Sequence, residues 1–261
     1  MKIAILYNGL FNTFKMCKDS HKKYIFDCLD EMNIDYDIYL NVSGIILFKS
    51  LNAGEEKLFY EKKEKINDLF ETTIHENEFS QKDGYMKLLK KELTDDTVKK
   101  NFYEITPKEK IKSFKIDNTK VLLSDNLHFL DSFPNTTFFE RAKDLKIQIN
   151  NENYSHFINI RPDFKITGNI DFERFFNLEQ DYLYMVYRID CLTVSNKMVC
   201  DIFTDENIKF IYNDESIINL KKNSIYKNNI HFEICYSEII KKLNILPILV
   251  QSGVKLDIRT L

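Results

Sequence analysis

Glycine is scarce in this chain, with six residues among 261. None of the six stands in a GxGxxG pattern or in a GxxxxGK[ST] pattern. Both motifs use closely spaced glycines to bring backbone N–H groups against phosphate. Their absence removes support for a Rossmann dinucleotide fingerprint and for a P-loop.

Common catalytic and metal-binding motifs are also missing. The five histidines show no HxH or HExxH spacing, which argues against a histidine metal site. The five cysteines form no CxxC pair, and their odd number does not suit a complete disulfide framework. No GxSxG elbow is present. We therefore expect free thiols in a reducing compartment and no serine-hydrolase site.

Long apolar runs and a strong charge imbalance are absent as well. No apolar stretch approaches the roughly 20 residues that a membrane helix requires, and the run at 1–6 is too short for a signal peptide. The net charge is −3 and the pI is about 6.0, which gives no general attraction to nucleic acid. We expect a cytoplasmic protein with no membrane span and no nucleic-acid partner.

The first 42 residues predict the fold class. Lys2–Tyr7 is a short apolar run before Asn8-Gly9, which indicates a buried strand and a turn. Apolar residues recur at helical spacing over 16–32, and Asp35–Val42 indicates a second strand. This order of strand, helix and strand predicts a βαβ unit in an α/β protein with a parallel sheet.

A charged segment at about 52–116 interrupts this pattern. Lys and Glu alternate in it, as at 61–65 and 87–92, and Thr106-Pro107-Lys108-Glu109 has the composition of a helix start. We interpret the segment as a helical insertion with a solvated face rather than as a nucleic-acid patch. A lid or an acceptor-side wall is a further interpretation of the same segment.

Strand and helix patterns alternate again after the insertion. Strands are predicted at 120–125, 156–160, 182–187, 208–212, 246–250 and 254–258. Helices are predicted after Pro134, between Asp190 and about Phe203, and over 232–243. The whole chain, 1–261, is therefore predicted to be a single domain with a mostly parallel central sheet flanked by helices and one helical insertion.

Polar residues stand at three predicted strand ends, where open α/β sheets bind ligands. The first is the loop Asn8–Lys15, whose free N–H groups at a helix start suit phosphate, although a simple strand–helix turn explains it equally. The second is Arg161-Pro162-Asp163, and the third is Arg188-Ile189-Asp190. An aspartate at a strand tip suits a divalent cation, and a neighbouring arginine suits phosphate. Each Arg-x-Asp pair is also explained by an ordinary surface ion pair.

Five segments of the chain match a known set of motifs. Gly9–Phe14 follows the first strand as a Gly-x-x-Arg-Thr-Phe loop does, and Tyr154–Asp163 matches a Tyr-Asp…Ile-Arg-x-Arg-Pro-Asp strand. Asp190–Met198, Phe232-Glu233 and Ile258-Arg259 echo three later segments of the same pattern. On these residues the chain resembles the small α/β glycosyltransferase-like proteins of capsule, lipopolysaccharide and giant-virus glycan gene sets.

The resemblance implies a GT-A-like fold and a glycosyltransferase that acts in the cytoplasm, or in a host's cytoplasm if the source is viral. The reaction implied is transfer of a hexosyl or deoxyhexosyl group from a nucleotide-diphosphate sugar, such as a UDP-sugar, to a glycan acceptor. Asp163 would hold Mn²⁺ or Mg²⁺, and Asp190 would act as the base or as an acceptor-side group, with Glu233 behind it. The substrate-binding residues implied are Tyr7, Asn8, Gly9, Thr13, Lys15, Arg161 and Arg188.

The chain departs from the family pattern at three positions. Asn12 and Asn159 stand where the family has arginine, and Ser155 stands where it has aspartate. Glu233 is also explained as an acid that complements the dipole of the last helix. Two alternatives therefore stay open: a catalytically inactive binding protein, and another nucleotide-dependent transferase on the same fold.

Overall fold

A computed structural model describes residues 1–11, 14–43, 45–49, 75–81, 84–90, 94–117, 137–149, 153–185, 192–204, 206–207 and 239–249. In chain order the elements are β1 (Lys2–Leu10), α1 (Phe14–His21), η1 (Lys22–Phe26), α2 (Asp27–Glu31), β2 (Asp35–Ser43), β3 (Ile45–Lys49), β4 (His75–Gln81), β5 (Gly84–Lys90), α4 (Asp95–Tyr103), η2 (Lys108–Lys110), β6 (Ile111–Asp117), α6 (Thr137–Ile149), β7 (His156–Ile160), α7 (Phe172–Phe176), β8 (Tyr182–Met185), β9 (Leu192–Ser195), α8 (Val199–Ile202) and β10 (Leu246–Leu249).

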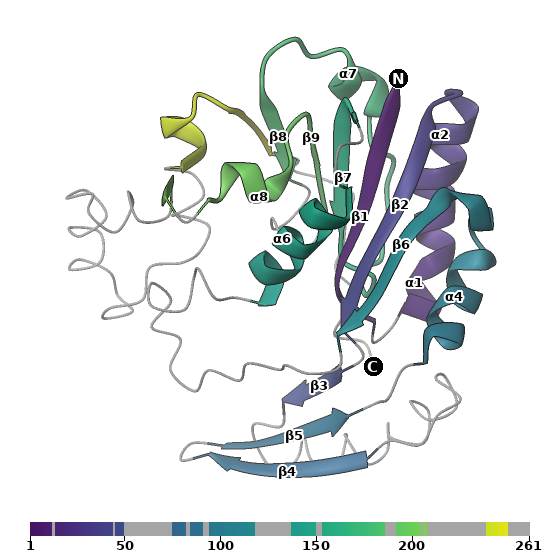
Figure 1. Ribbon diagram of the computed structural model, residues 1–261, viewed down its shortest axis with the longest axis vertical. Coiled ribbons are helices and arrows are strands. Elements are labelled where there is room, and N and C mark those ends of the chain that lie inside the picture. Colours follow the sequence, from purple (N-terminus) through teal and green to yellow (C-terminus); the bar gives the residue numbers. More distant parts are fainter. Residues whose placement is uncertain are drawn as a thin grey trace.

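A seven-stranded sheet forms the centre of the molecule, in the order β10-β8-β9-β7-β1-β2-β6 (Figure 1). Strand β1 pairs in parallel with β2 and β7, β2 pairs in parallel with β6, and β10 pairs in parallel with β8. Only β9 runs against its neighbours among the strands described in this sheet. The predicted α/β class with a mostly parallel central sheet flanked by helices is confirmed.

The predicted βαβ unit at the start of the chain is confirmed. Residues 14–31 are helical throughout, with a π-helical segment, η1, between α1 and α2. The helix buries Phe14, Cys17 and His21, which recur at the helical period and so face the sheet. Asn33 ends it with a positive φ of 55°, as short polar residues often do at helix ends.

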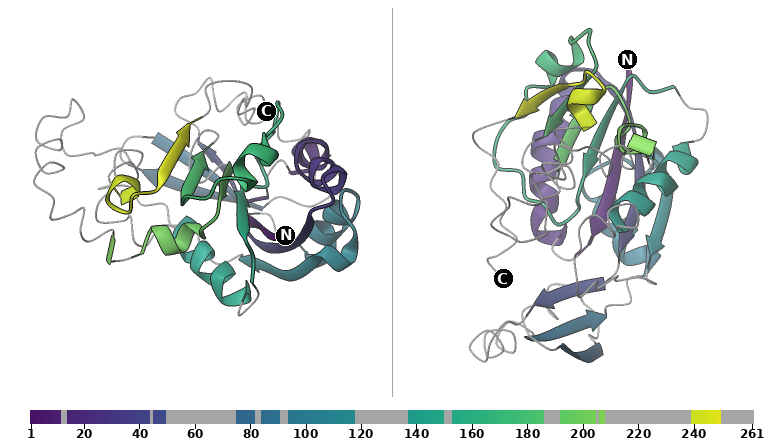
Figure 2. Two further views of the ribbon diagram at one scale, coloured as in Figure 1. Left: turned by 90° about the horizontal axis from the view of Figure 1, so that it is seen from above. Right: turned by 90° about the vertical axis from the view of Figure 1, so that its left-hand side faces the viewer.

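Helices cover both faces of the sheet (Figures 1 and 2). On one face, Ile5 and Tyr7 of β1 join a buried cluster with Phe14 of α1 and Phe102 of α4. On the other face, Leu6 of β1 packs in a second cluster with residues of α6 and α8. Because successive strand residues point to opposite faces, β1 supplies residues to both cores. None of the helices in the described part of the chain is long and apolar enough to cross a membrane.

Strands occupy much of the segment that the sequence predicted to be helical. Strands β3, β5 and β4 form an antiparallel three-stranded sheet, and β6 joins the main sheet. Helix α4 fits the prediction, and its cap residue Thr94 accepts a 3.3 Å hydrogen bond from the N–H of Thr97. The helical prediction is therefore wrong for 75–81, 84–90 and 111–117, whereas the division into a single domain stays a prediction.

The second half of the chain corrects one prediction and leaves others untested. The helix expected after Asp190 is wrong for 192–195, which form the antiparallel strand β9, and helical residues follow only in α8. The predicted elements at 156–160, 182–185 and 246–249 and the helix α6 are confirmed. The predicted strands at 120–125, 208–212 and 254–258 lie outside the described residues.

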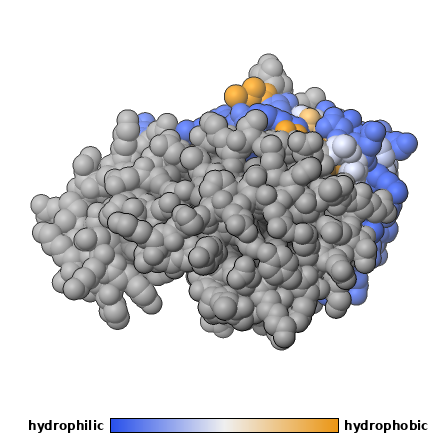
Figure 3. Space-filling model, turned by 90° about the horizontal axis from the view of Figure 1, so that it is seen from below, coloured by the Kyte–Doolittle hydropathy of each residue, from blue (hydrophilic) through white to orange (hydrophobic). Residues whose placement is uncertain are grey.

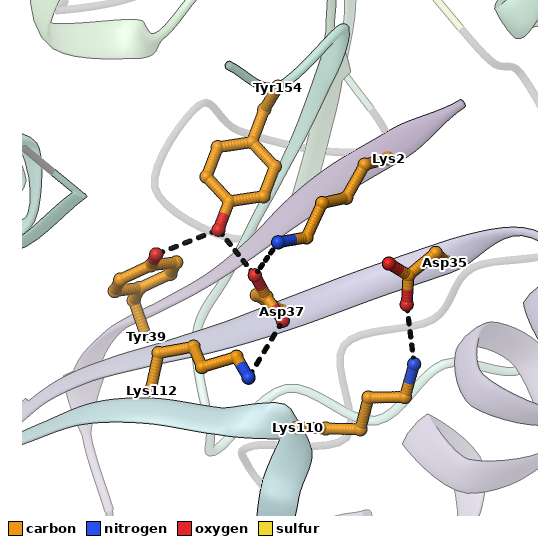
Figure 4. Close-up of polar contacts among 7 residues, drawn as sticks. All are labelled: Lys2, Asp35, Asp37, Tyr39, Lys110, Lys112 and Tyr154. Atoms are coloured by element: carbon orange, nitrogen blue, oxygen red, sulfur yellow. Dashed lines mark hydrogen bonds and ion pairs between the residues drawn. The ribbon is translucent and has the colours of Figure 1, made fainter. Parts of the chain in front are cut away.

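A buried carboxylate ties the amino ends of three strands together (Figure 4). Asp37 of β2 accepts a 2.6 Å hydrogen bond from the hydroxyl of Tyr154, and it pairs with Lys2 of β1 at 2.6 Å. Lys112 of β6 lies 3.5 Å from its other oxygen, and the hydroxyls of Tyr39 and Tyr154 are 2.8 Å apart. Every partner comes from a different segment, so this cluster holds the amino edge of the sheet.

Candidate functional site

The carboxyl ends of the parallel strands meet at the lower edge of the sheet in Figure 1. The three-stranded sheet β3-β5-β4 lies beyond this edge in both Figures 1 and 2. Seen from below, the coloured residues lie along the upper and right margin of the view and are largely hydrophilic, with small hydrophobic spots (Figure 3). Open α/β sheets bind their ligands at this edge.

Arg161 and Asp163 form the most defined polar contact at this edge. Nε of Arg161 donates to Oδ1 of Asp163 at 2.9 Å, and Nη2 donates to Oδ2 at 2.8 Å. The Asp163 side chain is 1% exposed, whereas that of Arg161 is 21% exposed. The ion pair expected as one alternative is therefore formed, between a buried carboxylate and an arginine side chain that is partly exposed.

Gly9 allows the arginine to lie across the end of β1. Tyr7 pairs with Ile160, so Arg161 leaves β7 beside Asn8 and Gly9. Gly9 has a φ of +141°, and a Cβ placed on it would lie 3.1 Å from Cγ of Arg161. Only glycine tolerates both this backbone conformation and this contact without strain. The prediction that Gly9 lies at the candidate site fits this geometry, and its role there is to make room.

Helix α1 holds the loop that follows Arg161. The backbone N–H of Ile166 donates to Oγ of Ser20 at 3.0 Å. Nε2 of His21 bonds to the carbonyl oxygen of Phe164, which can only accept, so this ring nitrogen carries the proton. Nδ1 of His21 then accepts from the hydroxyl of Tyr7 at 3.0 Å. The loop is thus fixed to both α1 and β1.

Tyr7 lies in the core rather than at the edge of the sheet. It is fully buried, and its ring packs edge-on against Phe14 and Phe102 at centroid distances of 5.9 and 4.7 Å. Burial raises its pKa well above the usual value for tyrosine. Burial also lowers the pKa of His21 to about 4, so the imidazole is neutral. This placement argues against the predicted substrate contact by Tyr7.

A row of polar residues crosses three strands near the carboxyl edge. Asn8 pairs with Asn41, which pairs with Lys115. Both asparagines are fully buried. Nδ2 of Asn41 lies 3.4 Å from the carbonyl oxygen of Arg141 and 3.3 Å from Oδ2 of Asp144, which also pairs with Lys115. Asn8 was predicted to bind substrate, whereas Asn41 was missed, although an asparagine inside an apolar strand is a visible signal.

Asn159 and Thr193 form a second buried polar pair, which lies farther from the carboxyl edge of the sheet than Asn8 and Asn41. They face each other across β7 and β9, with 2% and 0% exposure. Within the described parts of the chain, Nδ2 of Asn159 and Oγ1 of Thr193 have no hydrogen-bond partner. Asn159 takes the position of an arginine in the resembling family, and it is buried rather than facing solvent. Thr193 was not predicted.

The other predicted site residues are placed only in part. Lys15 is exposed in the first turn of α1. The predicted substrate contacts Thr13 and Arg188 and the predicted catalytic pair Asp190 and Glu233 lie outside the described residues. The structure therefore brings Asn8 and Gly9 of β1 together with Arg161 and Asp163, which follow β7. The catalytic pair stays a prediction.

The side chains around Asp163 decide whether it can bind the predicted metal ion. Both oxygens of Asp163 accept from Arg161, and the carboxylate is buried. The described residues contain no group of three or more His, Cys, Asp or Glu side chains that could hold a metal ion. A hard divalent cation requires several oxygen ligands and is repelled by a guanidinium. Asp163 in this arrangement does not fit the role of metal ligand, and the predicted Mn²⁺ or Mg²⁺ stays untested.

Comparison with known proteins finds distant structural likeness among solved structures. No family model matches the sequence, and no curated protein matches it significantly. Among solved structures the chain is similar to the apo form of the glycosyltransferase GlyE from Streptococcus pneumoniae TIGR4, with a TM-score of 0.33 and 11% sequence identity. The match covers 96% of this chain and 45% of GlyE, so the chain spans less than half the length of that protein.

Proposed function

We propose that this protein is a glycosyltransferase that binds a nucleotide-diphosphate sugar at the carboxyl edge of its sheet. The observation that carries the proposal is the guanidinium of Arg161, which Asp163 holds in a two-bond fork beside Gly9. Arginine recognises phosphate oxygens through paired N–H donors, and a fixed orientation reduces the ordering required on binding. The family resemblance supplies the substrate class, a nucleotide sugar with a glycan as acceptor.

The chemistry requires a cation at the leaving group. As the bond from the sugar to the diphosphate breaks, negative charge grows on the diphosphate oxygens. A preorganised positive group placed there stabilises the transition state more than the ground state. In the proposal Arg161 has this role, and Asn8 and Asn41 belong to the polar wall beside it. Asp190 is proposed to take the proton of the acceptor hydroxyl, with Glu233 behind it.

Nucleotide release from a panel of UDP-, GDP- and CMP-sugars tests the proposal. We expect the full chain to release nucleotide from one donor class, and Arg161→Lys to lower that rate about tenfold or more, equivalent to about 1.4 kcal/mol. Arg174→Lys is the matched control, because Arg174 is exposed in α7 at the opposite end of the sheet (Figure 1). If Arg161→Lys releases nucleotide as fast as the control variant, the assignment of Arg161 is wrong.

A further inference from the structure

We propose that Asn159 of β7 and Thr193 of β9 bind a single neutral hydroxyl group, which belongs either to an enclosed water molecule or to a sugar. The two residues face each other across antiparallel strands, at 2% and 0% exposure. As far as the structure describes the chain, neither Nδ2 of Asn159 nor Oγ1 of Thr193 has a hydrogen-bond partner. Buried polar atoms in folded proteins nearly always have one, so two such atoms on facing residues indicate that a bound group completes them.

The chemistry of the two atoms selects a hydroxyl group. The amide nitrogen of Asn159 only donates, so the ligand must accept a hydrogen bond from it, which excludes a cation. The hydroxyl of Thr193 both donates and accepts. A hydroxyl oxygen that accepts from the amide and donates its own proton to Oγ1 of Thr193 therefore satisfies both atoms at once.

The neighbours of the pair favour a neutral ligand over an anion. Leu6 of β1 pairs with Asn159, and Met185 of β8 pairs with Thr193, so the row is apolar on both sides of the pair. Leu6 belongs to the buried cluster that includes residues of α6 and α8, and residues in register on neighbouring strands share a face of the sheet. An anion in this layer would lose its hydration at a far higher cost than a neutral hydroxyl group.

The spacing of the pair suits one oxygen atom. Directly opposed residues of antiparallel strands have Cβ atoms about 4.5–5.5 Å apart. Two hydrogen bonds of about 2.8–3.0 Å to one shared oxygen atom bridge side chains at this spacing. Because both residues are buried, a larger ligand would place only its hydroxyl group here. The inference does not depend on the proposed function, since water supplies the same chemistry as a sugar hydroxyl.

A crystal structure of the full chain that shows ordered water tests the inference directly. We expect one oxygen atom within about 3.2 Å of both Nδ2 of Asn159 and Oγ1 of Thr193. A direct hydrogen bond between the two side chains, or rotation of either side chain to a protein partner, would overturn the inference.

The same crystals soaked with UDP-, GDP- and CMP-sugars distinguish the two sources of the hydroxyl group. A sugar hydroxyl that replaces the water between Asn159 and Thr193 assigns the site to the sugar. Water that stays in place while a donor is bound assigns the site to water. Failure of every donor to bind, with the water in place, would contradict the proposed function and support the inference.

Thr193→Val and Asn159→Leu test the inference in solution. Each variant replaces a polar side chain by the apolar side chain of the same branching. If a hydroxyl group bridges the pair, either change removes one of its hydrogen bonds, so the urea midpoint of unfolding should fall. The double variant should recover part of this loss, because two apolar partners require no bridging group. Single variants with unchanged or higher midpoints would contradict the inference, because they would have lost only an unsatisfied polar atom.

Thr97→Val and Asn101→Leu are the matched control. They make the same substitutions in α4, where Nδ2 of Asn101 donates to the carbonyl oxygen of Thr97 at 2.8 Å. Their double variant should show no recovery of the midpoint, because the two side chains share no bridging group. Equal recovery in the two double variants would show that the effect belongs to the substitutions rather than to a bound hydroxyl group, and would overturn the inference.

Discussion

The hydroxyl of Tyr7 donates a 3.0 Å hydrogen bond to Nδ1 of His21, which joins β1 to the first helix inside the core. The other ring nitrogen of His21 bonds to the carbonyl of Phe164, three residues beyond Arg161. A single buried imidazole therefore connects β1, α1 and the loop of the candidate site. The stability of the fold and the geometry of the site are coupled through this residue.

Tyr7→Phe should destabilise the protein without a direct effect on ligand contacts. The change leaves Nδ1 of His21 buried without its donor, which costs about 1–3 kcal/mol. Urea unfolding of the variant measures this cost. Tyr103→Phe is the control, because Tyr103 is exposed in α4 and the variant should match the wild type. A stable Tyr7→Phe protein that no longer binds sugar nucleotide would instead restore the predicted substrate contact.

Stability should fall as the pH drops from about 6.5 to about 4. Burial lowers the pKa of His21 to about 4 in the folded protein, while the unfolded chain protonates His21 near its usual value of 6.5. Between these values the unfolded state binds more protons, so acid favours unfolding, by about 3 kcal/mol over the whole interval. Above pH 6.5 both states are neutral at His21 and the effect is fully retained.

Denaturant unfolding at a series of pH values measures this slope. His21→Gln should show a shallower dependence between pH 4 and 6.5, by up to one proton. His156 also has a pKa lowered by burial, but its contribution is common to both proteins and cancels in the comparison. Equal slopes for the wild type and His21→Gln would show that His21 is not the group that titrates.

Gly9→Ala should lower both stability and affinity. Alanine would have to adopt the φ of +141° that Gly9 has, and its Cβ would lie 3.1 Å from Cγ of Arg161. Such strain costs about 1–3 kcal/mol, and relief of the contact would move the guanidinium. Unfolding and pyrophosphate titration measure the two effects. Gly9 alone has a positive φ among the glycines that the structure describes, so Gly168→Ala is a control that should stay within a few tenths of a kcal/mol.

Asp37→Asn should destabilise the amino edge far more than Asp35→Asn. Asp37 is 4% exposed and bonds to Tyr154, Lys2 and Lys112 (Figure 4). Asparagine lacks the charge that holds the two lysines and keeps only one accepting oxygen, so we expect a cost of about 1–3 kcal/mol. Asp35 lies on the same strand, is 58% exposed and pairs with Lys110 at 2.7 Å. An exposed pair contributes about 0–1 kcal/mol. Equal melting temperatures for the two variants would contradict the structural role of Asp37.

The core of the fold was predicted correctly where the hydrophobic pattern lies within a short stretch of sequence. Apolar runs at 2–7 and 35–42 with a helical period between them are sufficient to predict a βαβ unit, because burial on both faces leaves few alternatives. The strands at 75–81 and 84–90 were misread because Lys and Glu were taken as a solvated helix. Asp83-Gly84 is a hairpin dipeptide that would have indicated strands instead.

The candidate site was predictable in place but not in detail. Pro162 after an apolar run located the end of β7, and Arg161 and Asp163 followed from it. Their mutual fork depends on side-chain torsions, and the space for it depends on Gly9, which lies 152 residues before Arg161. The direction of β9 depends on pairing between 157–160 and 192–195, which no local pattern contains. A sequence motif can show where the site residues are, but the tertiary contacts decide what role each of them has.

A thermal-shift screen of UDP-, GDP- and CMP-sugars tests the central claim most directly. The claim predicts that one donor class raises the melting temperature of the wild type and of Arg174→Lys. It predicts that the same donor leaves Arg161→Ala unchanged, because the cation that meets the diphosphate is gone. Equal shifts in Arg161→Ala and the wild type, or no shift with any donor, would contradict it.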